Sequence, residues 1–297
     1  MMNAFRSLNF ITHHPLNRHE PLKALGRVIA WQIATRLRPH AVVVPFVADT
    51  RLLVRRGMAG ATGNVYCGLH EFEDMGLVLH ALRRDDVFVD VGANIGSYTV
   101  LAAGAVGCRC LAFEPAPASY AALLDNIRLN NLVSRVDARN EGVGAQPGQL
   151  AFTTQLDTVN HVTVDAEPGK DTMIVPVTTL DIALAGAVPS VIKIDVEGFE
   201  TPVLAGACAT LQDPALLALL IELNGSGARY GFDESALHRQ VLASGFTSAR
   251  YDPLARRLQT TGTARATEGN TLYVRDIEKL RARVADAPRY AVRGVAL

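Results

Sequence analysis

A glycine turn between two short apolar runs constrains the fold of this chain more than any other feature. Residues 86–99 read Asp-Val-Phe-Val-Asp-Val-Gly-Ala-Asn-Ile-Gly-Ser-Tyr-Thr, and Cys-Leu-Ala-Phe-Glu-Pro follows at 110–115. The run Val87–Val91 is apolar except for Asp90, which is typical of a strand buried on both faces. Gly92 and Gly96 permit a tight turn, and a helix can begin after it. The pattern predicts a strand, a turn, a helix and a second strand.

The acid at the end of the second predicted strand points to an adenosine-type ligand. Glu114 follows Gly92 by 22 residues, close to the spacing that puts a carboxylate beside a ribose diol in nucleotide-binding βαβ units. A dinucleotide fingerprint has a glycine where this chain has Asn94, so a ligand without phosphates, such as S-adenosylmethionine, is favoured. The N–H group of Ser97 and the carboxylate of Asp90 suit its methionine arm. Another nucleotide and a purely structural turn are the alternatives.

Composition narrows the classes of protein that the chain can belong to. Lys+Arg and Asp+Glu both total 29, which argues against a nucleic-acid partner because such partners need a basic face. The four cysteines lack a CxxC spacing, so no zinc site is expected. No apolar run reaches the ~18 residues of a membrane-spanning helix, and the first 30 residues do not resemble a signal peptide. We therefore expect a cytoplasmic protein.

The N-terminal part differs from the rest of the chain. Before residue 40, six Lys and Arg residues stand against one acid, and large apolar residues recur at helical spacing: Leu22, Leu25, Ile29, Ile33 and Leu37. This stripe predicts a helix that packs against the main domain, with peripheral membrane contact by residues 20–37 as the alternative. Residues 41–56 alternate like a hairpin. We expect a helical and hairpin extension at 1–60, a main domain at 61–286 and a flexible tail at 287–297.

Strands and helices alternate through the main domain, which predicts a mostly parallel sheet covered by helices on both faces. Further strands are expected at 133–138, 190–195, 216–222, 246–251 and 270–274. Helices are expected at 72–82, 115–130, 199–211 and 235–244. Between residues 142 and 178 the chain is rich in Gly, Thr and Val without helical period. There we expect short added strands at 149–154, 161–164 and 173–177.

A second cluster of charges lies in the segment Val-Ile-Lys-Ile-Asp-Val-Glu-Gly-Phe-Glu at 191–200. Lys193 and Asp195 share one face of an otherwise apolar strand, where charges must pair or face a cleft. For Lys193 a structural ion pair with Asp195 is favoured. For Asp195, at the mouth of the strand, a role in the site is favoured. If this strand neighbours Val87–Val91, then Asp195 and Glu197 open onto the crevice beside the glycine turn, and Glu222 at the end of the next strand lines the same crevice.

The order of these motifs resembles the FkbM-type methyltransferases. The similar stretches are residues 88–99, 112–115, 126–131, 177–181 and 192–200. The resemblance implies a Rossmann-like class I methyltransferase with a seven-stranded sheet whose last strand is antiparallel, and O-methylation of a hydroxyl on a sugar, glycolipid or natural product. It implies that S-adenosylmethionine is held by Asp90, Gly92, Asn94, Gly96 and Glu114. Glu141 falls where an adenine contact is expected.

Methyl transfer to a hydroxyl predicts a general base near the reacting methyl group. We expect Asp195 to accept or orient the proton, with support from Glu197 or Glu222. His70 and His161 are rivals, because imidazole titrates near neutral pH. A magnesium ion on the carboxylates is possible in principle but not favoured. A non-catalytic cofactor-binding partner of a biosynthetic assembly and an NAD-dependent oxidoreductase are the competing functions, and the acceptor and oligomeric state stay open.

Overall fold

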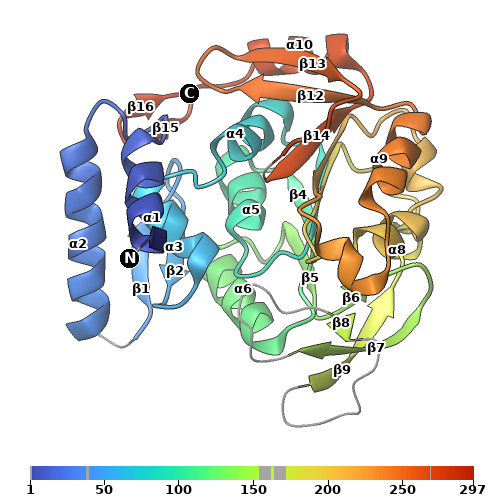
Figure 1. The fold of residues 1–297 in the computed structure, drawn as a ribbon, viewed down its shortest axis with the longest axis horizontal. Helices are drawn as coiled ribbons and strands as arrows, with labels where there is room; N and C mark the ends of the chain where they lie inside the picture. The colour runs from blue at the N-terminus through green and yellow to red at the C-terminus, as the bar shows by residue number, and fades with distance from the viewer. Residues whose placement is uncertain (1, 38–39, 154–161, 164–171, 268) are drawn as a thin grey trace.

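The structure is a computed structural model that describes residues 2–37, 40–153, 162–163, 172–267 and 269–297 (Figure 1). Its centre is an eight-stranded sheet with the strand order β13-β12-β14-β11-β10-β3-β4-β5. The strands from β11 to β5 are parallel. They comprise Ala218–Glu222 (β11), Val191–Ile194 (β10), Val87–Val91 (β3), Arg109–Phe113 (β4) and Val136–Arg139 (β5). This arrangement confirms the predicted Rossmann-like fold.

Helices cover both faces of the sheet, and each face has its own apolar core (Figure 1). One face carries α4 (Phe72–Ala81), α5 (Ser97–Val100) with its π-helical continuation η1 (Leu101–Val106), and α6 (Pro117–Leu129). The other face carries α7 (Leu180–Leu184), α8 (Glu200–Ala205) and α9 (Glu234–Ala243), with the 3-10 turns η3 (Thr210–Gln212) and η4 (Ser226–Tyr230). Nearly all side chains of the middle strands are apolar and buried, so these strands need cover on both faces.

The antiparallel end of the sheet has one strand more than predicted. Strand β14 (Asn270–Val274) pairs with β11, β12 (Thr247–Asp252) pairs with β14, and β13 (Arg257–Gly262) completes the edge, all antiparallel. The prediction of a seven-stranded sheet is therefore wrong, because β13 adds an eighth strand. Its sequence Arg-Leu-Gln-Thr-Thr-Gly has one large apolar residue, Leu258, because an edge strand exposes most of its side chains.

A second, four-stranded sheet lies beside the carboxyl ends of the central strands (Figure 1). Its strands are Gly142–Val143 (β6), Thr172–Thr178 (β9), Gly148–Thr153 (β7) and Val162–Thr163 (β8), in that spatial order. The predicted short strands at 149–154 and 173–177 are confirmed over the described residues, and residue 154 lies outside them. The predicted strand at 161–164 is described only at Val162–Thr163, since 161 and 164 lie outside the described residues.

The N-terminal extension consists of α1 (Met2–His13), α2 (Pro21–Leu37), the antiparallel pair β1 (Val42–Pro45) and β2 (Arg51–Val54), and α3 (Ala59–Cys67). The predicted helix and hairpin are confirmed. The predicted packing of the apolar stripe is wrong, because four of its five members are exposed: Leu22, Ile29, Ile33 and Leu37. Helix α2 instead buries Ala24, Trp31 and Thr35. Among the described residues, no helix combines the length and the apolarity that crossing a bilayer requires.

The last residues pack against the protein, which differs from the expected flexible tail at 287–297. After α10 (Ile277–Ala285), strands β15 (Ala291–Val292) and β16 (Val295–Ala296) form a hairpin. Val292 and Leu297 are buried, and the Arg293 guanidinium donates to the carbonyl of Val65 on α3. Apolar residues on both sides of a turn at Arg293-Gly294 explain why this short segment can bury one face.

Candidate active site

The glycine turn lies directly against the end of strand β10. Gly92 has a φ of +84°, and a Cβ atom added there would lie 1.8 Å from the carbonyl oxygen of Asp195. Asn94 also has a positive φ, +51°, and its backbone N–H donates to the Glu114 carboxylate over 2.8 Å. The turn is therefore held between β10 and β4 by a contact that only glycine permits and by hydrogen bonds to β4, because the Gly92 and Ala93 N–H groups also donate to the Phe113 carbonyl.

Glu114 ends β4 as a buried carboxylate that faces a cavity. We call this the Glu114 cavity; Gly92 and Asn94 also line it. One Glu114 oxygen accepts from Asn94 N–H and the other from Ala116 N–H, each over 2.8 Å. Burial raises the pKa of Glu114 to about 7. Each oxygen keeps acceptor capacity, so the carboxylate can receive two further hydroxyl donors side by side.

Apolar side chains form the opposite wall of the Glu114 cavity. The second sheet supplies this wall from β7 and β9, through Leu150, Phe152, Val175 and Val177. Glu141 lines the same cavity, beside Gly142 at the start of β6. A polar floor with an apolar wall suits a flat, partly polar ligand such as a nucleoside. The sequence did not predict that the inserted strands would form this wall.

A second cavity, of ≈ 240 Å³, lies on the other side of the turn. We call it the Lys193 cavity; it is also lined by Asp90, Ser97 and Tyr98, and it shares Gly92, Asn94 and Asp195 with the Glu114 cavity. Asp90 accepts a hydrogen bond from the Thr99 hydroxyl, and burial raises its pKa. The two cavities therefore form one elongated site that bends around the glycine turn.

Gly96 is the one predicted cofactor-binding residue that lines neither cavity. It has a φ of +88°, and a Cβ atom there would lie 2.5 Å from Leu123 of α6. Its part in the turn is to let α5 pack closely against α6.

Asp195 follows β10 and lies between the two cavities. Its Oδ2 is 2.7 Å from the Lys193 ammonium, which confirms the predicted ion pair. Burial opposes the charge of Asp195, but Lys193 and hydrogen bonds from Lys193 and Glu222 outweigh it, so its pKa is lowered. Burial likewise opposes the charge of Lys193, but Asp195, Glu71 and Asp90 raise its pKa. Strand β10 pairs in register with β3, Lys193 beside Asp90, as the predicted crevice requires.

Glu197 and Glu222 complete a cluster of three carboxylates at the ends of β10 and β11. One oxygen from each of Asp195, Glu197 and Glu222 lies within 4.8 Å of the others. Burial and the charge of Asp195 raise the pKa of Glu222 to about 8, and the two side chains share a hydrogen bond. Burial also raises the pKa of Glu197, whose φ is +54°. The Lys193 ammonium offsets one of the three carboxylate charges, and Glu222 offsets a second while it keeps its proton.

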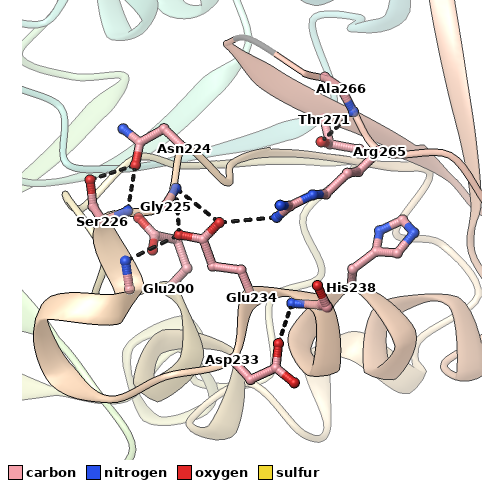
Figure 2. Close-up of polar contacts among 12 residues, drawn as sticks. Glu200, Asn224, Gly225, Ser226, Asp233, Glu234, His238, Arg265, Ala266 and Thr271 are labelled. Carbon is pink, nitrogen blue, oxygen red and sulfur yellow. Dashed lines mark hydrogen bonds and ion pairs between the residues drawn. The ribbon is translucent and has the colours of Figure 1, made fainter.

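Two buried glutamates hold the loops that carry these carboxylates. Glu200 accepts from the backbone N–H groups of Val196 and Gly198, on either side of Glu197. Figure 2 shows Glu234 of α9 reaching the loop after β11, where it accepts from Gly225 N–H, while the Arg265 guanidinium lies 3.1 Å away. No local sequence pattern singles out either glutamate, since their partners are backbone amides of the loops after β10 and β11.

A wide groove of ≈ 870 Å³ joins the Lys193 cavity through His70 and Glu71, which line both. We call it the Asn270 groove. The Asn270 amide donates to Glu71 and to Asp74, and burial raises the pKa of Asp74 to about 7. The sequence did not identify Glu71, Asp74 or Asn270, because only the tertiary fold brings α4 and β14 together.

Of the two histidines considered as alternative general bases, His70 is described by the structure and His161 is not. Burial lowers the pKa of His70, and its Nδ1 is buried without a hydrogen-bond partner among the described residues. His70 lines the Lys193 cavity, whereas Glu197 and Glu222 do not. His161 lies outside the described residues.

Two curated relatives are methyltransferases. The chain is 30% identical over 138 residues to "Hexuronic acid methyltransferase AglP" of Haloferax volcanii, covering 46% of this chain and 56% of the relative. It is 32% identical over 146 residues to "Methyltransferase 1" of Beauveria bassiana, covering 41% of this chain and 58% of the relative. The matches thus span just over half the length of these relatives.

Solved methyltransferase structures are similar at a lower level. The C-terminal domain of precorrin-6Y C5,15-methyltransferase from Rhodobacter capsulatus aligns with a TM-score of 0.37 and 15% identity, over 67% of this chain and 83% of that one. Residues 90–248, which include all the predicted catalytic residues and most of the elongated site, match the Methyltransferase FkbM domain. Since that match covers more than half of the chain, the protein belongs to the FkbM methyltransferase family.

Proposed function

We propose that the protein transfers the methyl group of S-adenosylmethionine to a hydroxyl of a sugar, glycolipid or natural product. The observation that carries this proposal is the position of Asp195, which lines both arms of the elongated site and hydrogen-bonds Glu222. The name of the Haloferax relative, a hexuronic acid methyltransferase, supports an acceptor of the sugar class.

The residues around the elongated site fit S-adenosylmethionine. Gly92 lines both cavities and lets the turn lie against the Asp195 carbonyl, which a Cβ atom at this position would overlap. We assign Glu114 to the ribose diol, Glu141 and the apolar wall to the base, and Asp90, Asn94 and Ser97 to the methionine arm. When bound, the cofactor supplies an electrophilic methyl group on a sulfonium.

The Asp195–Glu222 pair is the general base of the proposal. A sugar hydroxyl is a poor nucleophile while protonated, so a nearby proton acceptor is needed. The raised pKa of Glu222, about 8, belongs to the pair, because the two carboxyls share a proton. A base with this pKa accepts a proton efficiently near neutral pH. Glu197 supports the pair from the same cluster.

The Asn270 groove is the proposed path of the acceptor. It opens into the Lys193 cavity beside His70, and the Asn270 Oδ1 has no hydrogen-bond partner among the described residues. Glu71, Asp74 and this free oxygen are all acceptors. A groove so rich in acceptors suits a ligand rich in hydroxyl donors.

The test measures S-adenosylhomocysteine released from labelled S-adenosylmethionine with a panel of sugars, uronic acids and glycolipids. We expect Asp195→Asn to lower turnover by about a hundredfold or more, while the affinity for S-adenosylmethionine changes little. Asp49→Asn, in the exposed β1–β2 turn, is the matched control and keeps full turnover.

Treatment of the methylated product with mild alkali identifies the bond formed. A methyl ether survives and supports O-methylation of a hydroxyl, whereas a methyl ester is cleaved and would contradict it. Full turnover in Asp195→Asn would remove Asp195 from the base, and cofactor binding without release with any acceptor would favour a non-catalytic partner.

A further inference from the structure

The outward face of helix α2 carries four of the large apolar side chains that are exposed in the described part of the chain. Leu22 is 80% exposed, Leu37 77%, Ile29 59% and Ile33 52%. These positions recur at spacings of seven and four, so they follow one side of the helix. Gly26 and Ala30 lie on the same side and are exposed too, which makes the strip continuous.

The opposite face attaches α2 to the protein. Trp31, Ala24 and Thr35 are buried on it. The Arg27 guanidinium donates to the carbonyl of Tyr66, and Gln32 donates to the Tyr66 hydroxyl. Helix α2 is the outermost element on its side of the molecule and packs against α1 and α3 (Figure 1). The strip is therefore presented outward by a helix that is fixed from behind.

The charged residues of α2 itself are all cations. Helix α2 contains no Asp or Glu, and its exposed cations Lys23 and Arg36 lie on the two sides of the strip. Arg6 and Arg18 are exposed nearby in sequence. Glu20, the single acid before residue 40, is already paired with Lys23 at 2.6 Å. An exposed apolar strip with a cationic border is the pattern of a helix that lies in a bilayer interface.

We propose that the outward face of α2 docks on the surface of an anionic lipid bilayer. The helix lies in the plane of the interface, with Leu22, Ile29, Ile33 and Leu37 among the acyl chains and Lys23 and Arg36 at the headgroups. This proposal does not depend on the methyl acceptor or on the base assigned above, because none of these residues lines the elongated site.

A second copy of the chain fits this face less well. Two copies related by a twofold axis would place the same strip on itself, so Lys23 and Arg36 of one copy would meet cations of the other. No acid of α2 is available to offset that repulsion. Anionic headgroups offset it on both sides of the strip.

The test is sedimentation of the full chain with vesicles of phosphatidylcholine alone and of phosphatidylcholine with phosphatidylglycerol. We expect binding to the anionic vesicles, weaker binding to the neutral ones, and a decrease as salt rises, because salt screens the headgroup attraction. Ile29→Gln with Ile33→Gln is expected to weaken binding about tenfold or more, and Gln keeps a good helix propensity at these exposed positions.

A matched control removes the same kind of side chain elsewhere. Val133 and Ile182 are 68% and 59% exposed and lie outside α2. Val133→Gln with Ile182→Gln should bind the anionic vesicles like the unchanged protein. Lys23→Gln with Arg36→Gln should lower binding about tenfold and reduce its salt dependence.

Three outcomes would overturn the proposal. The first is that the unchanged protein binds neither kind of vesicle. The second is that the Ile29 and Ile33 variant binds as well as the control. The third is that light scattering finds a dimer, that the Ile29 and Ile33 variant is a monomer, and that neither protein binds vesicles. This result would show that the outward face of α2 binds a second copy of the chain. Circular dichroism of each variant separates these results from loss of the fold.

Discussion

Glu114 and Asp195 follow the two strands that flank β3, one on each side, yet their surroundings differ in kind. Among the described residues Glu114 has no ion pair, and two backbone N–H groups donate to its oxygens. Asp195 has the Lys193 ammonium at 2.7 Å and accepts a hydrogen bond from the Glu222 carboxyl. The first carboxylate is fixed in place and its pKa is raised, while the second is kept ionised next to a group that titrates near pH 8. In the proposed function, this difference separates a carboxylate that holds the cofactor from one that accepts a proton.

The largest expected effect comes from Gly92, which lines both the Glu114 cavity and the Lys193 cavity. Gly92→Ala puts a Cβ atom 1.8 Å from the Asp195 carbonyl at a φ of +84°, so the turn must shift. We expect a loss on the order of 3 kcal/mol in unfolding free energy, together with loss of cofactor binding. Thermal unfolding and calorimetry measure the two.

Gly186→Ala is the matched control for that clash. Gly186 has a φ of +88° but no heavy atom within 4 Å of an added Cβ, so it retains only the cost of the left-handed backbone. Equal destabilisation in both variants would show that backbone conformation, rather than the contact with Asp195, makes Gly92 necessary.

The next largest effect concerns Glu114 and the affinity for the cofactor. Glu114→Ala removes two charge-assisted hydrogen bonds worth about 1.5–3 kcal/mol each, so the affinity for S-adenosylmethionine should fall by about a hundredfold or more. Because the pKa of Glu114 is about 7, we also expect the unchanged protein to bind more weakly as the pH falls below 7. Calorimetry at several pH values checks both, with Glu278→Gln on exposed α10 as control. Unchanged affinity in a folded variant would refute the ribose assignment.

The smallest expected effect concerns the Asp195–Glu222 pair and the pH dependence of turnover. Glu222 keeps its proton below about pH 8. We therefore expect kcat/KM of the unchanged enzyme to rise with pH up to about 8, as the Asp195–Glu222 pair becomes able to accept a proton. In Glu222→Gln this rise should be lost, with a decrease of a few fold at pH 8. A profile identical to that of the unchanged enzyme would exclude the pair as the base.

Much of the sheet could be predicted because its central strands are short apolar runs bounded by glycines and acids. The pairing of β10 with β3, which was the condition for the predicted crevice, is confirmed. Strand β13 and helix α10 were missed, because both are largely polar and bury few residues: Leu258 in β13, and Leu280 and Val284 in α10. Such elements depend on neighbours that local periodicity does not reveal.

The burial of α2 was predicted wrongly for a related physical reason. A helical stripe of Leu and Ile shows which residues share a face but does not show which face meets the protein. Here the buried face carries Trp31 with the small residues Ala24 and Thr35, whose periodicity is weaker. Glu200 and Glu234 were missed at the site because their partners are loop amides, and Asn270 was missed because its partners are acids far along the chain.

The close contact between Gly92 and the Asp195 carbonyl also couples two equilibria. The turn cannot change position without displacing the backbone that carries Asp195, so no relay of side chains is needed between them. If filling the Glu114 cavity alters the proton affinity of the Asp195–Glu222 pair, removal of that proton must alter donor affinity by the same factor. Proton release on S-adenosylmethionine binding, measured in buffers of different ionisation enthalpy, therefore measures the coupling between the glycine turn and the Asp195–Glu222 pair.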